Sequence, residues 1–188
     1  MGAIVTTNRS NLPAITGGTA QYLTFMLGGE VFALGILNIK EIIEYGNLTE
    51  VPMMPPFIRG VINLRGRVVP VVDLAARFGR GVTQVAKRTS IVIIEVSTLV
   101  QTEEGQETDT QDIGVMVDAV NEVVDIDASE IEPAPNFGAR IRPEFISGMA
   151  KRAGGFTIVL DISRVLSVDE MSALGHSLFG ETGEEGHA

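Results

Sequence analysis

The chain has 188 residues, of which 24 are acidic and 14 are basic, so its net charge at neutral pH is −10. This length suffices for one or two hydrophobic cores. The negative charge argues against a general nucleic-acid binder, which needs basic surface to neutralise phosphates. The sequence contains no cysteine, so disulfides, thiolate nucleophiles and cysteine metal sites are excluded. It also has no secretory signal pattern and no apolar run of the roughly 18 residues that cross a bilayer.

The first half of the chain begins with a polar stretch, residues 1–20, which we expect to be a flexible tail. Short runs of β-branched and aromatic residues then predict strands. These predicted strands are residues 22–27, 31–34, 48–51, 61–64 and 68–72. Between the last two strands, Arg65, Gly66 and Arg67 predict a tight turn.

Two helical features are expected in this half. Ile36, Ile39 and Ile42 or Ile43 have the spacing of one or two helical turns packed against a barrel. Asp73 follows a strand and precedes an apolar set, which is typical of a helix N-cap.

The second half repeats this order of elements. Strands are predicted at residues 91–96, 113–117, 126–131, 146–150 and 156–160. Residues 98–112 read as an acidic loop between two strands, and Asp161 as a second N-cap. A capping box at Ser167–Glu170 predicts a C-terminal helix over residues 167–174, followed by a flexible tail at 175–188.

The two halves are related by an internal repeat. Residues 57–78 align without a gap on residues 145–166, and residues 32–43 align on residues 113–124. Three of the matched pairs are Gly60 with Gly148, Asp73 with Asp161, and Glu41 with Glu122. The chain is therefore predicted to be mostly β, with two copies of a small barrel of about five strands.

Catalytic chemistry is not indicated. The only histidines, His176 and His187, lie in or near the C-terminal tail, and no phosphate-binding glycine motif occurs. Asp73 and Asp161 occupy matched positions, which favours a shared structural role over one active site. We therefore expect no enzyme activity, no cofactor and no metal site.

Charge is distributed unevenly along the chain. Half of the basic residues lie between Arg59 and Arg88, where Asp73 is the single acidic residue. Such a basic face is expected to meet a protein partner with complementary acidic groups. The alternative is a solvated face that keeps the protein soluble.

Several motifs resemble the CheW-like domain family. They include P-x-F-I-R-G-V-I-N-L-R-G-R-V-V-P-V-V-D-L at residues 55–74, G-V-M-V-D-x-V at 114–120 and I-x-P-x-P at 131–135. The N-L-R-G block is the most specific of them, and the resemblance runs over most of the chain.

The resemblance implies two SH3-like five-stranded β-barrels packed together, with short helices and a C-terminal helix. The CheW-like domain would cover residues 21–174, with its first barrel at about 21–86 and its second at about 87–166. Because the family's barrels exchange segments, these boundaries need not follow the repeat.

The resemblance also implies a function. Family members are non-catalytic adaptors that join the cytoplasmic tip of methyl-accepting chemotaxis receptors to the regulatory domain of the histidine kinase CheA. The protein would be cytoplasmic, would meet the membrane only through receptors, and could form hetero-oligomeric rings. The alternatives are the same role in a non-flagellar chemosensory pathway and a small-ligand-binding double barrel.

A set of residues is carried over as the receptor- and kinase-binding site. Its members are Arg65, Glu41, Ile39, Arg59, Asn63, Leu64 and Ile36. Arg65 is the arginine of the N-L-R-G turn, whose guanidinium can pair with a carboxylate in a bidentate manner. Gly66 and Gly148 are expected to shape turns, and Asp73 and Asp161 to cap helices. The sequence departs from the family in the longer, more acidic segment 98–112.

Overall fold

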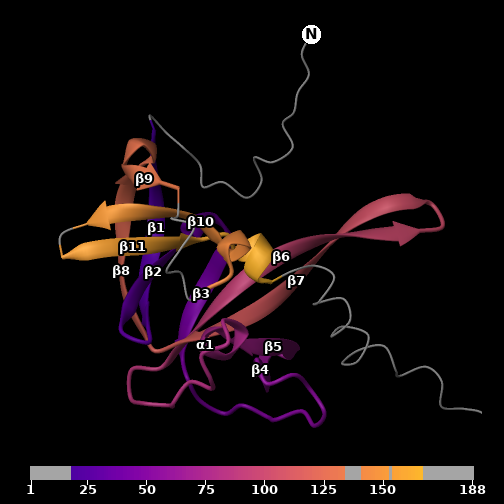
Figure 1. Ribbon diagram of the computed structural model, residues 1–188. Helices are drawn as coiled ribbons and strands as arrows, with labels where there is room; N and C mark the ends of the chain where they lie inside the picture. Colours follow the sequence, from indigo (N-terminus) through magenta and orange to yellow (C-terminus); the bar gives the residue numbers. More distant parts are fainter. Residues whose placement is uncertain (1–17, 134–140, 153, 167–188) are drawn as a thin grey trace, which may run out of the picture.

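The computed structural model describes residues 18–133, 141–152 and 154–166. Strands account for most of this part of the chain, which confirms the predicted mostly β class (Figure 1). The strands are β1 (Thr19–Leu27), β2 (Glu30–Gly35), β3 (Ile39–Glu44), β4 (Ile58–Leu64), β5 (Arg67–Asp73), β6 (Ser90–Thr102), β7 (Gly105–Val117), β8 (Ala119–Asp127), β9 (Ile131–Glu132), β10 (Ile146–Arg152) and β11 (Gly155–Leu160). The short helices are η2 (Ile36–Asn38), α1 (Leu74–Arg77), η3 (Ala128–Glu130), η4 (Pro143–Phe145) and α2 (Ile162–Val165).

The strands form two SH3-like sheets, each with five or six strands. Sheet A has the order β8-β1-β2-β11-β10-β9, and sheet B has the order β3-β6-β7-β5-β4. Each sheet takes strands from both copies of the repeat. In sheet B, β5 runs parallel to β7, and in sheet A, β11 runs parallel to β2. The predicted boundary between residues 86 and 87 divides the sequence into the two copies. Each sheet contains strands from both sides of this boundary.

The sequence repeat is a structural repeat in detail. The β4–β5 pairing shifts register between Ile58 and Gly60, and the β10–β11 pairing shifts between Ile146 and Gly148. Both hairpins also close in the same way, since the Asp73 N–H donates to the carbonyl of Phe57 and the Asp161 N–H donates to the carbonyl of Phe145.

The matched glycines allow a close approach between strands. A Cβ atom on Gly60 would lie 2.2 Å from the Thr49 carbonyl oxygen, and one on Gly148 would lie 2.4 Å from Cγ2 of Ile131. Real Cβ atoms do not approach other atoms so closely. Glycine at residue 148 therefore serves strand packing, rather than the turn for which it was predicted.

Each predicted cap lies at the start of a short helix. Asp73 accepts hydrogen bonds from the N–H groups of Ala75 and Ala76 at the start of α1. Asp161 accepts one from the N–H of Ser163 at the start of α2. An N-cap carboxylate satisfies backbone donors that have no partner inside the helix.

The structure corrects three predicted elements. The helix expected around Ile36–Ile43 is only the single turn η2, after which β3 pairs with β6, because tertiary pairing overrides the apolar spacing. The strand expected at 48–51 reduces to one bridge between Thr49 and Val61. The strand expected at 126–131 is divided into the end of β8, η3 and β9.

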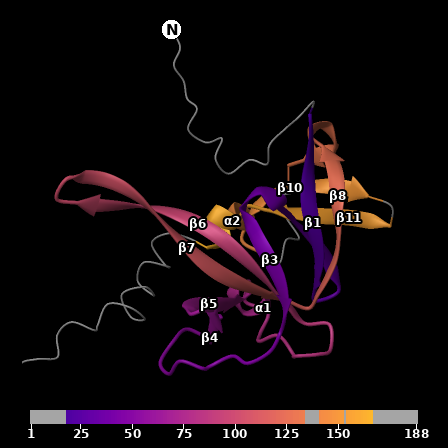
Figure 2. The ribbon, with the colours of Figure 1, turned by 180° about the vertical axis from the view of Figure 1, so that it is seen from behind.

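The acidic segment 98–112 is a β-hairpin rather than a loop. β6 and β7 have 13 residues each and remain paired as far as Thr102 and Gly105, with Glu103 and Glu104 in the turn. The paired strands project from the body as a two-stranded ribbon (Figures 1 and 2). The outer parts of β6 and β7 were not predicted as strands, because a ribbon exposed on both faces lacks the alternation of apolar and polar residues that indicates a strand.

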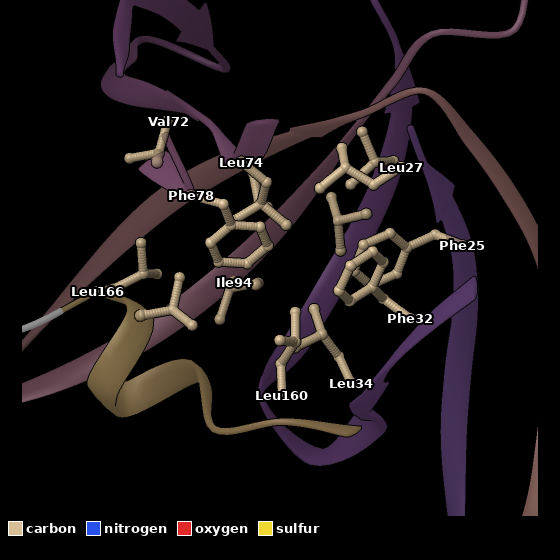
Figure 3. Packing of buried hydrophobic residues seen from close by; sticks show 14 of the residues in the cluster. Phe25, Leu27, Phe32, Leu34, Val72, Leu74, Phe78, Ile94, Leu160 and Leu166 are labelled. Carbon is tan, nitrogen blue, oxygen red and sulfur yellow. The ribbon is translucent and has the colours of Figure 1, made fainter. Parts of the chain in front are cut away.

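The largest hydrophobic cluster contains buried residues of both sheets. Four of its phenylalanines follow one another at ring-centroid distances of 5.8–5.9 Å, in the order Phe25, Phe32, Phe78 and Phe145. Figure 3 shows Phe25, Phe32 and Phe78 among the aliphatic side chains of this cluster. Burying each such ring contributes about 1.5–3 kcal/mol, so this cluster holds the sheets together.

Each sheet also has a smaller cluster of its own. The cluster of sheet A is lined by small residues such as Ala33 and Ala150. The cluster of sheet B contains Ile91, Ile93 and Met116. Strand β6 thus buries both faces, with Val92 and Ile94 in the large cluster and Ile91 and Ile93 in the smaller one.

Three predictions concern residues that the structure leaves undescribed. The C-terminal helix at 167–174 and the tail at 175–188 lie outside the described residues, as do residues 1–17 of the predicted N-terminal tail. β1 begins at Thr19, inside that predicted tail. Among the described helices, none is long and apolar enough to span a bilayer.

Candidate protein-binding site

The tip of the β4–β5 hairpin has an unusual backbone. Leu64 pairs with Arg67, so Arg65 and Gly66 form a two-residue turn. Their φ angles are +55° and +84°, as a type I′ turn requires at both central positions. A left-handed conformation is routine for glycine but costs about 1–2 kcal/mol for other residues. The N–H of Gly66 donates to Oδ1 of Asn63, which supports the turn from inside the hairpin.

Arg65 and Glu41 form a bidentate ion pair. The two terminal guanidinium nitrogens of Arg65 each donate to one carboxylate oxygen of Glu41, both at 2.8 Å. These hydrogen bonds raise the pKa of Arg65 above its usual value. The Arg65 side chain is nevertheless 74% exposed, and that of Glu41 is 26% exposed. The pair therefore joins the β4–β5 tip to β3 and leaves most of the guanidinium accessible.

Further charged residues extend this pair across sheet B. The Asp112 side chain is only 7% exposed and lies between Lys40 at 3.1 Å and Arg67 at 3.3 Å. Lys40 also lies 3.6 Å from Glu95, which is paired with Asp112 across β6 and β7. We call these residues the charged cluster. Its members are Lys40, Glu41, Arg65, Arg67, Glu95 and Asp112, with three charges of each sign.

The predicted apolar site residues are half-buried. Ile36 and Ile39 pack against the large hydrophobic cluster, and Leu64 packs against the cluster of sheet B. Their main contacts are therefore inside the molecule. The structure instead exposes three apolar side chains that sequence reasoning missed, one each on η2, β3 and β5: Leu37 at 57%, Ile42 at 43% and Val68 at 55%. No sequence signal separates these from buried residues, because all lie in apolar runs.

Arg59 forms no ion pair with the charged cluster and instead contacts Asp73 and Thr83. Its guanidinium donates to Oδ2 of Asp73 at 3.1 Å and to the carbonyl of Thr83 at 3.2 Å. The side chain is 19% exposed, and Asp73 is fully buried. A buried carboxylate needs such a partner, because an unpaired charge in the interior is costly. The geometry gives Arg59 a structural role within the first copy of the repeat, and its contact with a partner protein stays a prediction.

The described residues contain no group of three or more histidine, cysteine, aspartate or glutamate residues placed to hold a metal ion. What the surface offers is an exposed arginine on a strained turn, a charged cluster and exposed apolar side chains. Arginine and apolar groups together are typical of protein–protein interfaces. The fold and site thus define a double SH3-like barrel of the protein-interaction class.

Comparison with known proteins places this double barrel in a family. Residues 21–170 match the CheW-like domain, so the chain belongs to the CheW-like family. It is 31% identical over 152 residues to the chemotaxis protein CheW of Klebsiella aerogenes, covering 81% of this chain and 84% of that protein. The crystal structure of the scaffolding protein TtCheW from Thermoanaerobacter tengcongensis superposes with a TM-score of 0.66 and 33% identity, covering 80% of this chain and 94% of that one.

A relative with a different name also matches. The chain is 26% identical over 156 residues to Protein FrzA of Myxococcus xanthus, covering 82% of this chain and 89% of that protein. The similarity in each case spans both sheets. Chemotaxis scaffolding is accordingly the role to which the family points.

Proposed function

We propose that this protein is a non-catalytic, cytoplasmic adaptor that couples methyl-accepting chemotaxis receptors to the histidine kinase CheA. It would bind the cytoplasmic receptor tip and the kinase regulatory domain, and would reach the membrane only through the receptor. The observation that carries the proposal is the exposed Glu41–Arg65 pair. Arg65 of this pair lies in the N-L-R-G turn, the segment by which the sequence resembles the family most specifically.

The geometry of this pair suits recognition of a partner. Glu41 holds the guanidinium plane in one orientation, so less side-chain entropy is lost when a partner binds. The backbone at Arg65 is strained, and strained residues gather at functional sites. Its repeat counterpart in the sequence is Ala153, so the fold does not itself require arginine at this turn.

The surroundings of the pair complete a surface of the kind that interfaces use. The three charges of each sign in the charged cluster are paired with one another. Strands β3 and β5, which contribute to this cluster, also expose the apolar side chains Ile42 and Val68. Exposed apolar and charged side chains are both used by protein interfaces. Contacts of this size are weak singly, and repetition in hetero-oligomeric rings would strengthen them through effective concentration.

The test is binding and kinase stimulation by the whole chain. Arg65→Glu places two carboxylates together and removes the guanidinium. We expect capture of a receptor cytoplasmic fragment, and stimulation of the kinase, to fall about tenfold or more. The free energy of unfolding should change by only about 0.5 kcal/mol, because the residue is exposed. Lys151→Glu is the matched control, since Lys151 is exposed on the equivalent β10–β11 hairpin.

A reciprocal variant separates orientation from charge. Combining Glu41→Arg with Arg65→Glu restores the ion pair with its direction reversed. If partners read the guanidinium at the hairpin tip, the double variant should fold normally and still fail to couple. Unaltered kinase stimulation by Arg65→Glu would discard the proposed role of this residue.

The same adaptor role in a non-flagellar chemosensory pathway is the second candidate. The match to Protein FrzA favours this second candidate, because the name of that relative does not refer to chemotaxis. The two candidates differ in their partners and share the site. Capture experiments with receptors and kinases from each pathway of the host would distinguish them.

A further inference from the structure

The outer part of the β6–β7 hairpin is a two-stranded ribbon that pairs with no other described strand on either edge. β6 loses its outer partner β3 after Ile94, and β7 has no partner on its outer edge before Gly114. Beyond these points the two strands remain paired with each other from Glu95–Asp112 to Thr102–Gly105. We call residues 97–110 the arm. Extended strands rise about 3.3 Å per residue, so the ribbon reaches on the order of 25 Å from the body.

Such a ribbon calls for a physical explanation. An isolated two-stranded hairpin is marginally stable in water, and free strand edges invite pairing with other chains. The arm also exposes Leu99 to 69% and Val100 to 41%, on opposite faces of the ribbon. A long exposed ribbon with apolar side chains on both faces is suited to contact another protein.

The acidic residues of the arm indicate the charge that a partner protein would need. Glu103, Glu104, Glu107 and Asp109 are exposed, and none of them forms an ion pair within the described part of the chain. The sequence has no lysine or arginine between Arg88 and Arg140. Four negative charges that have no ion pair among the described residues therefore lie at the turn of the arm and on its β7 strand. We expect a partner of the arm to be basic.

A segment of this same chain has this property. Residues 81–88, which we call the basic loop, precede β6, and residues 81–86 form no helix or strand. Val82 and Val85 of the basic loop are 49% and 48% exposed. Lys87 and Arg88 are exposed, and neither forms an ion pair with a residue that the structure describes. The basic loop is anchored at Thr83, which hydrogen-bonds to Asp73, and it offers exposed apolar and cationic side chains on either side of this anchor.

The arm and the basic loop lie at opposite ends of the molecule. In Figure 1 the arm projects to the right, and the loop before β6 lies at the lower left. Figure 2, seen from behind, shows the same separation. Because the two segments of one molecule lie far apart (Figures 1 and 2), an arm can contact a basic loop only on a second molecule.

We propose that the arm of one molecule binds the basic loop of a second copy of this chain. The contact is head-to-tail, because different surfaces of the two molecules meet. Each molecule then keeps a free arm at one end of the assembly and a free loop at the other, so growth continues into a chain or closes into a ring. This self-association uses neither Arg65 nor Glu41, and so does not depend on the proposed receptor and kinase site.

The experiment measures the mass of the full-length chain by sedimentation at low and high salt. At about 20 mM salt the weight-average mass should rise above the monomer value of 20.1 kDa as concentration increases. At about 0.5 M salt the mass should return toward the monomer value, since exposed charges are then screened within a few ångströms.

Two charge-reversal variants sharpen the test. The arm variant combines Glu107→Lys with Asp109→Lys, and the loop variant combines Lys87→Glu with Arg88→Glu. Each variant alone should associate less than the wild-type chain. In the arm variant, the two new lysines cancel the charge of Glu103 and Glu104, and in the loop variant the loop becomes acidic like the arm. A mixture of the two should associate again, since lysines at 107 and 109 of one variant attract glutamates at 87 and 88 of the other.

A matched control separates the arm from net charge. Glu122→Lys with Glu130→Lys alters two exposed acidic residues elsewhere and shifts the net charge by the same amount as the arm variant. This control should associate like the wild-type chain. The proposal is overturned if the wild-type chain stays monomeric at low salt, if the arm variant associates as the wild type does, or if the mixture stays monomeric.

Discussion

Asp73 and Asp161 hold the same place in the two copies of the repeat, and each caps a short helix. Their surroundings differ. Asp73 is fully buried and accepts further hydrogen bonds from Arg59 and from the N–H and hydroxyl of Thr83. Asp161 is about one-third exposed, and its additional partners are the hydroxyl of Ser163 and the exposed Arg164 at 4.0 Å.

This difference shows how a duplicated motif diverges. The cap is common to both copies because any helix start needs its backbone donors satisfied. The buried network exists only in the first copy, where residues 79–89 connect the copies and must be held against sheet B. Arg59 has Ser147 as its repeat counterpart, so the network could not form in the second copy.

The largest expected effect is therefore at Asp73. Asp73→Ala removes a cap and leaves the half-buried Arg59 without its carboxylate, so we expect the free energy of unfolding to fall by about 3–5 kcal/mol. Asp161→Ala is the matched control and should cost only about 1 kcal/mol, as for other caps. Urea unfolding followed by circular dichroism measures both. Equal losses in the two variants would contradict the comparison.

The matched glycines extend the comparison to the backbone. Gly60 has φ of +149°, and a Cβ there would meet a carbonyl oxygen, whereas the Cβ of Gly148 would meet first the Cγ2 methyl group of Ile131. A side chain can move more easily than a strand backbone. We expect Gly60→Ala to cost about 1–3 kcal/mol, and Gly148→Ala to cost less. The midpoints of thermal unfolding rank the two variants, and the reverse order would refute this reading.

Gly66 provides a smaller effect at the hairpin tip. Its φ is +84°, yet a Cβ would have no atom within 4 Å. Gly66→Ala should therefore cost about 1 kcal/mol, from backbone conformation alone. The Glu41–Arg65 pair should persist in this variant, which can be checked by kinase stimulation. A loss as large as that of Gly60→Ala would mean that hidden contacts exist at the tip.

The smallest expected effect concerns pH and a third capping aspartate, Asp127. Hydrogen bonds from the N–H and then the hydroxyl of Ser129 lower the pKa of Asp127. The stability that these bonds supply is present above the unfolded pKa of about 3.9 and is lost as pH falls through the lower folded value. Ser129→Ala should raise the folded pKa of Asp127 toward the unfolded value, as measured by carbon NMR titration. An unchanged pKa would show that the hydroxyl contributes nothing.

Several elements of the fold could be predicted from the sequence, because they depend on residues that are close together in the chain. The caps at Asp73 and Asp161, and the tight turn at Arg65–Gly66, were predictable because their requirements lie within a few residues. The repeat was visible because glycine and aspartate are needed at the same places in both copies. The predictions that failed, the helix at Ile36–Ile43 and the loop at 98–112, concern segments whose conformation depends on a distant strand.

The candidate site was predictable only in part. Arg65 and Glu41 were both expected from the family resemblance, and the structure joins them in one ion pair. Arg59 was expected at the same surface, and it lies instead against buried Asp73. Lys40, Arg67 and Asp112 were missed, because a charge on a strand has no sequence signature of its partner.

The sequence by itself determined the alternation of strands, the helix starts and the turn at Arg65, because propensity, capping and the sign of φ are local properties. The tertiary structure alone decided which strands are neighbours. β5 pairs with β7 and β11 pairs with β2, an exchange between the copies that places strands of both halves in each sheet. The residue pattern of a strand predicts which of its faces is apolar, but it does not predict which other strand will pair with its edge. The contact between Arg65 and Glu41 therefore could not be predicted from strand patterns.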